Sequence, residues 1–292
     1  MVWMFYRFQP KYKPLLTVNV AGQILEAKGK DSVTVSLDLG LSITEVKFSG
    51  NTILLPNRER LKVDKLLGLR DERAIYVVEE GEVKPVQLFQ DGHFYKLVNI
   101  DDKTPTLEVD GIHMHRVSEV KPWEDARVKV SYARVRPGMK VLDVCTGLGY
   151  TVTWELRMGA KEVLTVEKSE AVLRIAEYNP WSRCLSDKRV RVVLGDAFTY
   201  IKKLPDESFH RIIHDPPRFS LAGELYSLEF YKELHRVLKP GGILVHYTGT
   251  PRFKTRVSSV VKGVLKRVRM AGFTAKYLDE VKAVLCLKPK LP

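Results

Sequence analysis

Two different patterns of apolar and polar residues follow one another along this chain. Up to about residue 112, short alternating runs are separated by Gly, Asp and Asn, which is typical of antiparallel strands joined by turns. Examples are LLTVNVAGQILEAKG, SVTVSLDL, AIYVVEE and HFYKLVNI, and one brief helical stretch, VDKLLGLRDE, lies among them. This pattern predicts a small, mostly β amino-terminal domain over residues 1–112, with substrate recognition as its candidate role.

From about residue 123 the pattern changes to short apolar strands separated by helix-like segments. The strands are KVLDVC, EVLTVE, VRVVLG, FHRIIH and GGILVHYTG. After the fifth strand, apolar residues from Val257 to Val268 recur at the i, i+3, i+4, i+7 spacing of an amphipathic helix. GFTAKYLD and VKAVLCLKP then predict a closing pair of strands. The order predicts an α/β fold over residues 113–292, a Rossmann-like domain with a doubly wound, mostly parallel sheet.

The composition is that of a soluble globular protein, with 45% apolar and 28% charged residues. No run approaches the roughly 20 apolar residues of a membrane span. The opening MVWMFYRFQP lacks a signal-peptide cleavage site, and its aromatics and cations suit either base stacking or an arm packed on the domain. The cysteines Cys145, Cys184 and Cys286 are odd in number and far apart, without metal-type spacing. We therefore expect a cytoplasmic protein with no metal and no membrane partner.

The net charge of +13 is distributed unevenly. Residues 1–112 have 15 Lys and Arg against 16 Asp and Glu, whereas residues 113–292 have 33 against 19. No acid occurs among residues 251–278, which include the amphipathic helix. This basic excess favours a polyanionic partner, with RNA as the leading candidate, and a solvated lysine-rich surface is the alternative. The basic residues of the helix are Arg256, Lys262, Lys266, Arg267 and Arg269.

The motif VLDVCTGLGYT, residues 141–151, is the strongest chemical signal in the sequence. It predicts a buried strand, then a turn, then a helix. Glycine is needed in the turn because it lets the backbone turn tightly and approach a ligand. The spacing is D-x-x-x-G-x-G, with the acid first. A carboxylate there attracts a positively charged amino and sulfonium group and repels a pyrophosphate, so the loop favours S-adenosyl-L-methionine over NAD. The candidate cofactor-binding residues of this loop are Asp143, Cys145, Thr146, Gly147, Gly149, Tyr150 and Thr151.

Acids at two further strand ends complete the candidate cofactor site. Glu167 ends the next strand, 20 residues after Gly147, where a carboxylate accepts hydrogen bonds from ribose hydroxyls. Asp196 follows the third strand and is a candidate acceptor from the adenine amine, with Phe198 as a packing surface for the ring. Each acid alone is more often an ordinary loop residue, but three in this order form a specific combination. Lys168 and Ala197 are the neighbours included in the site.

The combination DVCTGLGYT, NPWS, GDA, HDPPRFSLAGELYS and RVLKPGG resembles class I S-adenosylmethionine-dependent methyltransferases over residues 123–292. It looks similar to a family of predicted archaeal methyltransferases. The resemblance implies S-adenosyl-L-methionine as the cofactor and a seven-stranded sheet in the order 3-2-1-4-5-7-6. Cys145 departs from the pattern, because many relatives have glycine there. We interpret it as a small buried side chain and not as a nucleophile.

The segment His214-Asp215-Pro216-Pro217 follows the fourth strand, and groups at this end of a parallel sheet face the binding crevice. Two prolines fix the backbone, so the Asp215 carboxylate and the Pro216 carbonyl become rigid hydrogen-bond acceptors. An amine that donates to both would aim its lone pair at the transferred carbon, which is catalysis by orientation and electrostatics. His214 is a candidate general base or, alternatively, a structural residue. The candidate substrate-binding residues are Arg218, Phe219, Tyr226 and Tyr247.

The proline segment resembles the Asn/Asp-Pro-Pro-aromatic signature of methyltransferases that act on exocyclic base amines. Asp215 stands where Asn is frequent, and Arg218 replaces the stacking aromatic, which Phe219 can supply one position later. A rigid turn without catalytic role is the alternative interpretation. Cytosine C5 chemistry needs a cysteine nucleophile. No cysteine follows the fourth or fifth strand in the active-site loops, so we exclude that mechanism.

Three functions follow from these observations. The first is methyl transfer to a nitrogen of a base in structured RNA, tRNA or rRNA, with the base flipped into the site. The second is transfer to a small amine or metabolite, including aminopropyl transfer from decarboxylated S-adenosylmethionine, since those enzymes also have an amino-terminal β domain. The glycine loop here lacks the extra glycines and acids of that family. The third is a non-catalytic binding module that retains the cofactor fold.

Overall fold

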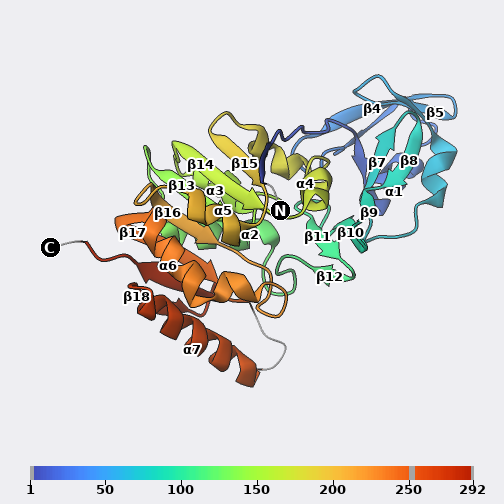
Figure 1. Ribbon diagram of the computed structural model, residues 1–292. Helices are drawn as coiled ribbons and strands as arrows, with labels where there is room; N and C mark the ends of the chain where they lie inside the picture. Colours follow the sequence, from blue (N-terminus) through green and yellow to red (C-terminus); the bar gives the residue numbers. More distant parts are fainter. Residues whose placement is uncertain (1–2, 250–253, 291–292) are drawn as a thin grey trace. The chain divides into compact units, whose positions relative to one another are not determined.

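The computed structural model describes residues 3–249 and 254–290, and for residues 254–258 it describes the backbone alone. The chain packs as two compact units (Figure 1). The α/β unit consists of Met1–Phe8, Trp123–Glu170 and Cys184–Pro292, and the β unit consists of Gln9–Pro122 and Ala171–Arg183. Among the described residues, no helix combines the length and the apolar character that a membrane span requires.

The α/β unit is built on one sheet, which has eight strands among the described residues, in the order β1-β15-β14-β13-β16-β17-β19-β18. Without β1 this is the predicted order 3-2-1-4-5-7-6. The predicted count of seven was wrong, because β1 pairs antiparallel with β15 and extends the edge of the sheet. The strands are β1 (Met4–Tyr6), β13 (Lys140–Val144), β14 (Glu162–Glu167), β15 (Val190–Leu194), β16 (Phe209–His214), β17 (Leu238–Tyr247), β18 (Thr274–Leu278) and β19 (Ala283–Leu287).

The aromatic start of the chain is part of this sheet. Trp3 lies over Gly195, where an added Cβ would come within 2.8 Å of the Trp3 Cβ, and its ring packs edge-on against Tyr200 at 5.0 Å. The described part of the segment is therefore an arm packed on the α/β unit, as one of the two interpretations of the sequence expected.

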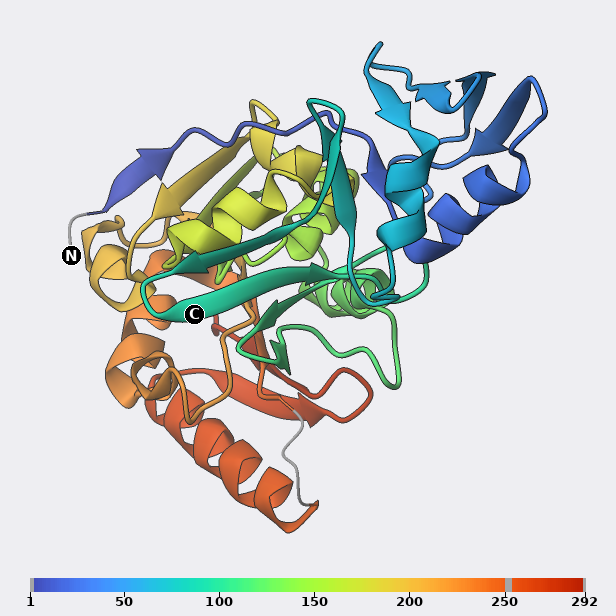
Figure 2. The same ribbon diagram turned by 90° about the vertical axis from the view of Figure 1, so that its right-hand side faces the viewer.

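Helices and apolar strands form the core of the α/β unit. The central strands pair in parallel and bury both faces, which explains their uninterrupted apolar runs. Phe230 and Leu234 of α6 and Val264 and Val268 of α7 are fully buried in the same cluster. Figure 2 shows α7 as a long red helix beside the terminal strand pair. The helices of this unit are α2 (Pro122–Ala133), α3 (Tyr150–Arg157), α5 (Ala197–Tyr200), η3 (Ile201–Lys203), η4 (Gly223–Tyr226), α6 (Leu228–Val237) and α7 (Lys254–Met270). Most of α4 (Glu170–Ala176) and of η2 (Pro180–Ser186) lies in the segment that belongs to the β unit.

The apolar face of α7 follows the predicted spacing over the described side chains. Val261, Val264 and Val268 are buried, whereas Lys262 and Lys266 on the other face are exposed. The side chains of Val257 and Arg256 lie outside the described residues.

The β unit contains three antiparallel sheets, in the orders β3-β4-β5-β6, β2-β7-β8 and β12-β11-β10-β9. This agrees with the mostly β composition expected for the amino-terminal part. Its elements are β2 (Leu15–Leu16), α1 (Val18–Glu26), β3 (Ser32–Val35), β4 (Thr44–Ser49), β5 (Thr52–Leu54), β6 (Arg60–Lys62), η1 (Val63–Gly68), β7 (Tyr76–Glu79), β8 (Glu82–Pro85), β9 (Gln87–Gln90), β10 (His93–Val98), β11 (Thr106–Val109) and β12 (Ile112–His113).

Helix α1 differs from the strand expected there. Thr17 caps the helix, since its hydroxyl accepts a hydrogen bond from the Val20 amide at 3.3 Å. Val20, Ala21 and Ile24 then fall on one buried face at helical spacing. The apolar residues of the segment therefore satisfy a period of 3.6 better than a period of 2.

The division between the units differs from the predicted boundary between residues 112 and 113. Ile112 and His113 form β12, which pairs with β11, so a cut at 112 would divide a hairpin. The β unit therefore continues to Pro122, and it also includes Ala171–Arg183. Met1–Phe8 belongs to the α/β unit because β1 joins that sheet.

Candidate active site

The loop between β13 and α3 has the tight backbone that its glycines predict. Cys145, Gly147 and Gly149 all have positive φ, at 73°, 52° and 71°. The amides of Cys145 and Thr146 both donate to the carbonyl of Val166 at the end of β14, at 3.0 and 3.2 Å. These bonds tie the loop to the neighbouring strand. The left-handed conformation of Cys145 explains why glycine is frequent there among the relatives that the motif resembles.

Gly149 is the position where this loop least tolerates a side chain. It lies directly before α3 with φ 71°, and a Cβ added there would lie 2.8 Å from Cδ2 of Leu185, itself buried. We expect Gly149→Val to lower the free energy of unfolding by about 2–4 kcal/mol, from backbone strain and overpacking together. Chemical denaturation measures this loss. Gly223→Ala is the matched control, because a Cβ there meets nothing within 4 Å, and equal stability losses in both variants would contradict the assignment.

The structure corrects the expected role of Asp143. Its side chain has no exposed surface, and its two oxygens accept hydrogen bonds from the hydroxyls of Thr165 at 2.6 Å and Thr151 at 2.7 Å. Burial raises its pKa to about 7. Asp143 therefore supports the loop from the interior and does not itself face an open site. Nearby Glu155 of α3 is also fully buried, with no hydrogen-bond partner for its carboxyl among the described residues.

Glu167 ties the loop to the end of β14. Its carboxylate accepts hydrogen bonds from three backbone amides, those of Gly147 at 3.0 Å, Lys168 at 2.9 Å and Ser169 at 3.0 Å. Burial raises the pKa of Glu167, and these three donors oppose the rise. The side chain is therefore part of the frame of the glycine loop, and its remaining acceptor capacity suits the predicted contact with a ribose.

The third acidic strand end also has local partners. Asp196 caps α5 by accepting from the amide of Thr199 at 3.1 Å, and its carboxylate pairs with Lys168 at 3.0 Å. Ala197 begins α5 beside it and is partly buried. Phe198 stacks on Phe230 with ring centroids 6.1 Å apart, so one face of the predicted adenine-packing residue is already covered.

The reaction segment begins at the end of β16. The amide of Asp215 donates to the carbonyl of Val144 at 3.1 Å, which places the segment beside the glycine loop. His214 points to the opposite side, as alternate residues of a strand do, and its ring stacks on that of His246 at 4.3 Å. Burial lowers the pKa of His214 well below its usual range. With no exposed surface, His214 is not placed to act as the general base considered from the sequence.

The predicted substrate-binding residues differ in how far they are exposed to solvent. The Tyr226 hydroxyl donates to the carbonyl of Pro217 at 2.8 Å, so this buried tyrosine holds the proline segment in place. Pro216 is buried, Pro217 and Arg218 are exposed, and Phe219 is 47% exposed with its ring edge-on to Tyr226. Arg218 and Phe219 are therefore available to a substrate, whereas Tyr226 is a support.

A buried lysine that sequence reasoning missed completes the site. Nζ of Lys129, on α2, lies 2.9 Å from Oδ2 of Asp215 and 2.8 Å from Oδ2 of Asp125. It also lies 3.8 Å from the centre of the Tyr247 ring, at the end of β17. The sequence does contain a signal, because Asp125 and Lys129 have the i,i+4 spacing of the buried helix face that includes Val130.

Four carboxyl groups surround Cys145. Burial raises the pKa of its thiol well above the usual range, and Glu167, Asp215, Asp143 and Asp196 raise it further. These acids come from the ends of four adjacent parallel strands. Burial among carboxyls favours the protonated form of this thiol, and that Cys145 is not a nucleophile stays a prediction. The acids at the strand ends, Glu167, Asp196 and Asp215, are of the kind that suits a cationic ligand.

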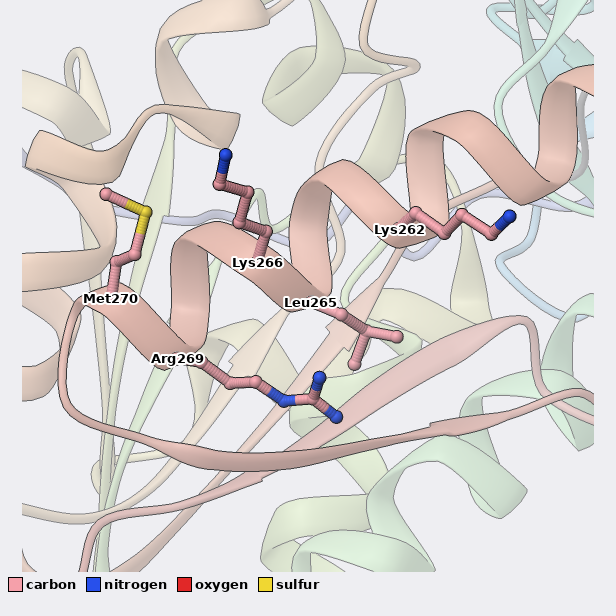
Figure 3. A pocket seen from close by; sticks show the side chains of 5 residues that line it. All are labelled: Lys262, Leu265, Lys266, Arg269 and Met270. Carbon is pink, nitrogen blue, oxygen red and sulfur yellow. The ribbon is translucent and has the colours of Figure 1, made fainter.

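The basic face of α7 forms a separate feature of the α/β unit. A hollow of about 400 Å³ is lined by Lys262, Leu265, Lys266, Arg269 and Met270, and Figure 3 shows these five side chains along the helix. The guanidinium of Arg269 donates to the carbonyl of Ala275 at 3.0 Å. No salt bridge to Lys262, Lys266 or Arg269 is found within the described part of the chain.

The strand order and the acidic strand ends define an α/β fold of the class I methyltransferase-like type. The chain belongs to the same family as Uncharacterized protein MJ1233 of Methanocaldococcus jannaschii. The two are 42% identical over 285 residues, which cover 94% of this chain and 96% of that protein.

The chain is also similar to proteins of aminopropyl transfer. Residues 161–279 match the Spermine/spermidine synthase domain. A polyamine aminopropyltransferase of Thermoplasma volcanium is 25% identical over 187 residues, which cover 63% of this chain and 65% of that enzyme's length. The crystal structure of spermidine synthase from Thermotoga maritima has a TM-score of 0.56 at 18% identity, covering 70% of this chain and 73% of that one. This likeness shows the fold alone, whereas the family matches favour the aminopropyl alternative over RNA methylation.

Proposed function

We propose that this protein transfers an aminopropyl group from decarboxylated S-adenosylmethionine to an amine. The observation that carries the proposal is the set of three acids at the strand ends beside the glycine loop, Glu167, Asp196 and Asp215. Decarboxylated S-adenosylmethionine has a sulfonium and an ammonium but no carboxylate. S-adenosylmethionine adds a carboxylate, which an acidic site disfavours.

The charges of these residues suit a donor that has two positive charges and no carboxylate. Burial raises the pKa of Asp143, Glu167 and Asp215, and of these three only Asp215 has a salt bridge within the described residues. The two lysines that contact the group, Lys129 and Lys168, already pair with Asp215 and Asp196. A dication would supply the missing charge.

Asp215 is the residue best placed to serve the acceptor amine. Its side chain is 23% exposed, and its backbone is fixed between Val144 and two prolines. In the reaction, the acceptor nitrogen forms a bond to the propyl carbon, the carbon–sulfur bond breaks with its electron pair on sulfur, and the nitrogen releases a proton. Asp215 accepts a hydrogen bond from that nitrogen and orients its lone pair, which is the role that the sequence predicted for it.

Product analysis tests this proposal. The protein is incubated with decarboxylated S-adenosylmethionine and a panel of aliphatic mono-, di- and triamines, and the products are identified by mass spectrometry. We expect an aminopropylated amine together with the adenosyl thioether. Methyl transfer from S-adenosylmethionine, without any aminopropyl transfer from the decarboxylated donor, would overturn the proposal.

A second candidate function is methyl transfer to a base nitrogen in structured RNA. The basic face of α7 favours it, because Lys262 and Lys266 are exposed and the helix has no acid. Each phosphate that a lysine neutralises releases counterions, so such a face binds RNA with a steep salt dependence.

For this candidate, we expect the double variant Lys262→Gln, Lys266→Gln to bind a structured RNA about tenfold more weakly at low salt. The slope of log Kd against log salt should fall by about 1–2, since two phosphate contacts are lost. Fluorescence anisotropy over a salt series measures both. Lys161→Gln, which replaces an exposed lysine directly before β14, is the control for loss of a charge elsewhere. Equal slopes for all three proteins would exclude α7 as an RNA-binding face.

A further inference from the structure

We propose that the ammonium group of Lys129 fills a subsite that could otherwise bind a substrate ammonium. Lys129 thereby determines which acceptor amines the protein accepts. This inference rests on the proposed function and names a determinant of its acceptor specificity. Lys129 fills a place between Asp125, Asp215 and the ring of Tyr247 that a substrate ammonium would otherwise fit.

The surroundings of the Lys129 ammonium have the composition of an alkylammonium site. Two carboxylate oxygens lie at 2.8 and 2.9 Å, and an aromatic face lies at 3.8 Å. Charge-assisted hydrogen bonds and a cation–π contact are the interactions that hold organic ammonium ions in proteins. They come from three separate elements, α2, the end of β16 and the end of β17, so the place is enclosed and not a surface ion pair.

Lys129 is charged in this place in spite of its burial. Its side chain is 6% exposed. Burial lowers the pKa of the ammonium, but Asp215 and Asp125 raise it by more, so that the pKa lies above its ordinary value. With both carboxylates ionised, the group formed by Asp125, Lys129 and Asp215 has one net negative charge, and its exposed part is the carboxylate of Asp215.

This charge arrangement selects among acceptors. A single amine nitrogen can approach the exposed part of Asp215. A second ammonium two to four carbons away along the same substrate would come close to the fixed Lys129 ammonium, where like charges repel strongly at low dielectric. We therefore expect the wild-type protein to prefer acceptors whose other cations are distant, and to discriminate about 10- to 100-fold against short diamines.

The test combines two variants and two measurements. Lys129→Ala opens the ammonium subsite, and the double variant Lys129→Ala, Asp125→Asn opens it while keeping one net negative charge. The first measurement needs neither donor nor turnover: the thermal midpoint of each protein is recorded with and without propylammonium or butylammonium. We expect both variants to gain several degrees more with the alkylammonium ion than the wild type, which offers it only the exposed part of Asp215. Lys140→Met, which removes an exposed lysine paired with Glu162, should behave as the wild type.

The second measurement is the ratio of kcat/KM for propane-1,3-diamine to that for propylamine. This ratio should rise at least tenfold in the double variant. If turnover with decarboxylated S-adenosylmethionine is absent in every protein, the proposed function fails, but the alkylammonium effect still tests the subsite. If the variants fold with wild-type circular dichroism and show no alkylammonium effect, Lys129 is a structural counter-ion and the inference is overturned. If Lys129→Ala alone does not fold, the double variant decides.

Discussion

Asp215→Asn is expected to lower kcat about 10²–10³-fold while donor affinity stays within a few-fold of the wild type. Removing one preorganised charged group from the active site of a group-transfer enzyme typically lowers kcat by about this factor. Asn keeps the size of the side chain, and the backbone amide of residue 215 still donates to the carbonyl of Val144. The charge that orients the acceptor amine is lost, and Lys129 keeps Asp125 and the ring of Tyr247 as partners. Single-turnover rates and donor titration measure the two quantities separately.

Asp206→Asn is the matched control for this prediction. Asp206 is 74% exposed and pairs with Arg236, so its neutralisation should leave kcat unchanged. Two results would contradict the role of Asp215. Turnover at the wild-type rate would place it outside the reaction, and loss of donor binding together with turnover would make it a mainly structural residue.

Glu167→Gln is expected to weaken donor binding by about 10²-fold and to lower the free energy of unfolding by about 2–4 kcal/mol. The glutamate accepts from the amides of Gly147, Lys168 and Ser169, and hydrogen bonds to a charged group contribute about 1.5–3 kcal/mol each. A glutamine has one acceptor oxygen and must turn its amide group toward at least one of these donors. We therefore expect the variant to lose both the hydrogen bonds that hold the glycine loop and the contact with the ribose. Calorimetric titration and chemical denaturation measure the two losses.

Glu162→Gln controls for the loss of a carboxylate on the same strand. Glu162 starts β14 and pairs at the surface with Lys140 and Arg191, so its replacement should change donor affinity little. Unchanged donor affinity in Glu167→Gln would show that the carboxylate of Glu167 serves the loop alone.

The hydrophobic pattern predicted the sheet of the α/β unit well, for a physical reason. Parallel strands that are buried on both faces must be apolar along their whole length, so KVLDV and EVLTVE are recognisable without tertiary information. A three-residue edge strand such as Met4–Tyr6 has no such constraint. Its partner, β15, is almost 190 residues away along the chain, so the sequence predicted no eighth strand.

The candidate site was predictable to the level of strand ends but not to the direction of each side chain. Asp143 and Glu167 both come from predicted strands, yet Asp143 points into the interior toward Thr151 and Thr165. A shift of one residue reverses the face to which a strand residue points. Lys129 escaped prediction because its partner Asp215 lies 86 residues away, although its i,i+4 spacing with Asp125 on a buried helix face was readable.

The affinities of two donors test the central claim most directly. Decarboxylated S-adenosylmethionine and S-adenosylmethionine differ only by a carboxylate, so the ratio of their Kd values reports whether the site accepts or rejects that negative charge. Isothermal titration of the same preparation with each compound gives this ratio. The acids at the strand ends, Glu167, Asp196 and Asp215, predict that the decarboxylated donor binds at least tenfold more tightly. Equal affinities, or tighter binding of S-adenosylmethionine, would contradict aminopropyl transfer and would favour methyl transfer as the reaction.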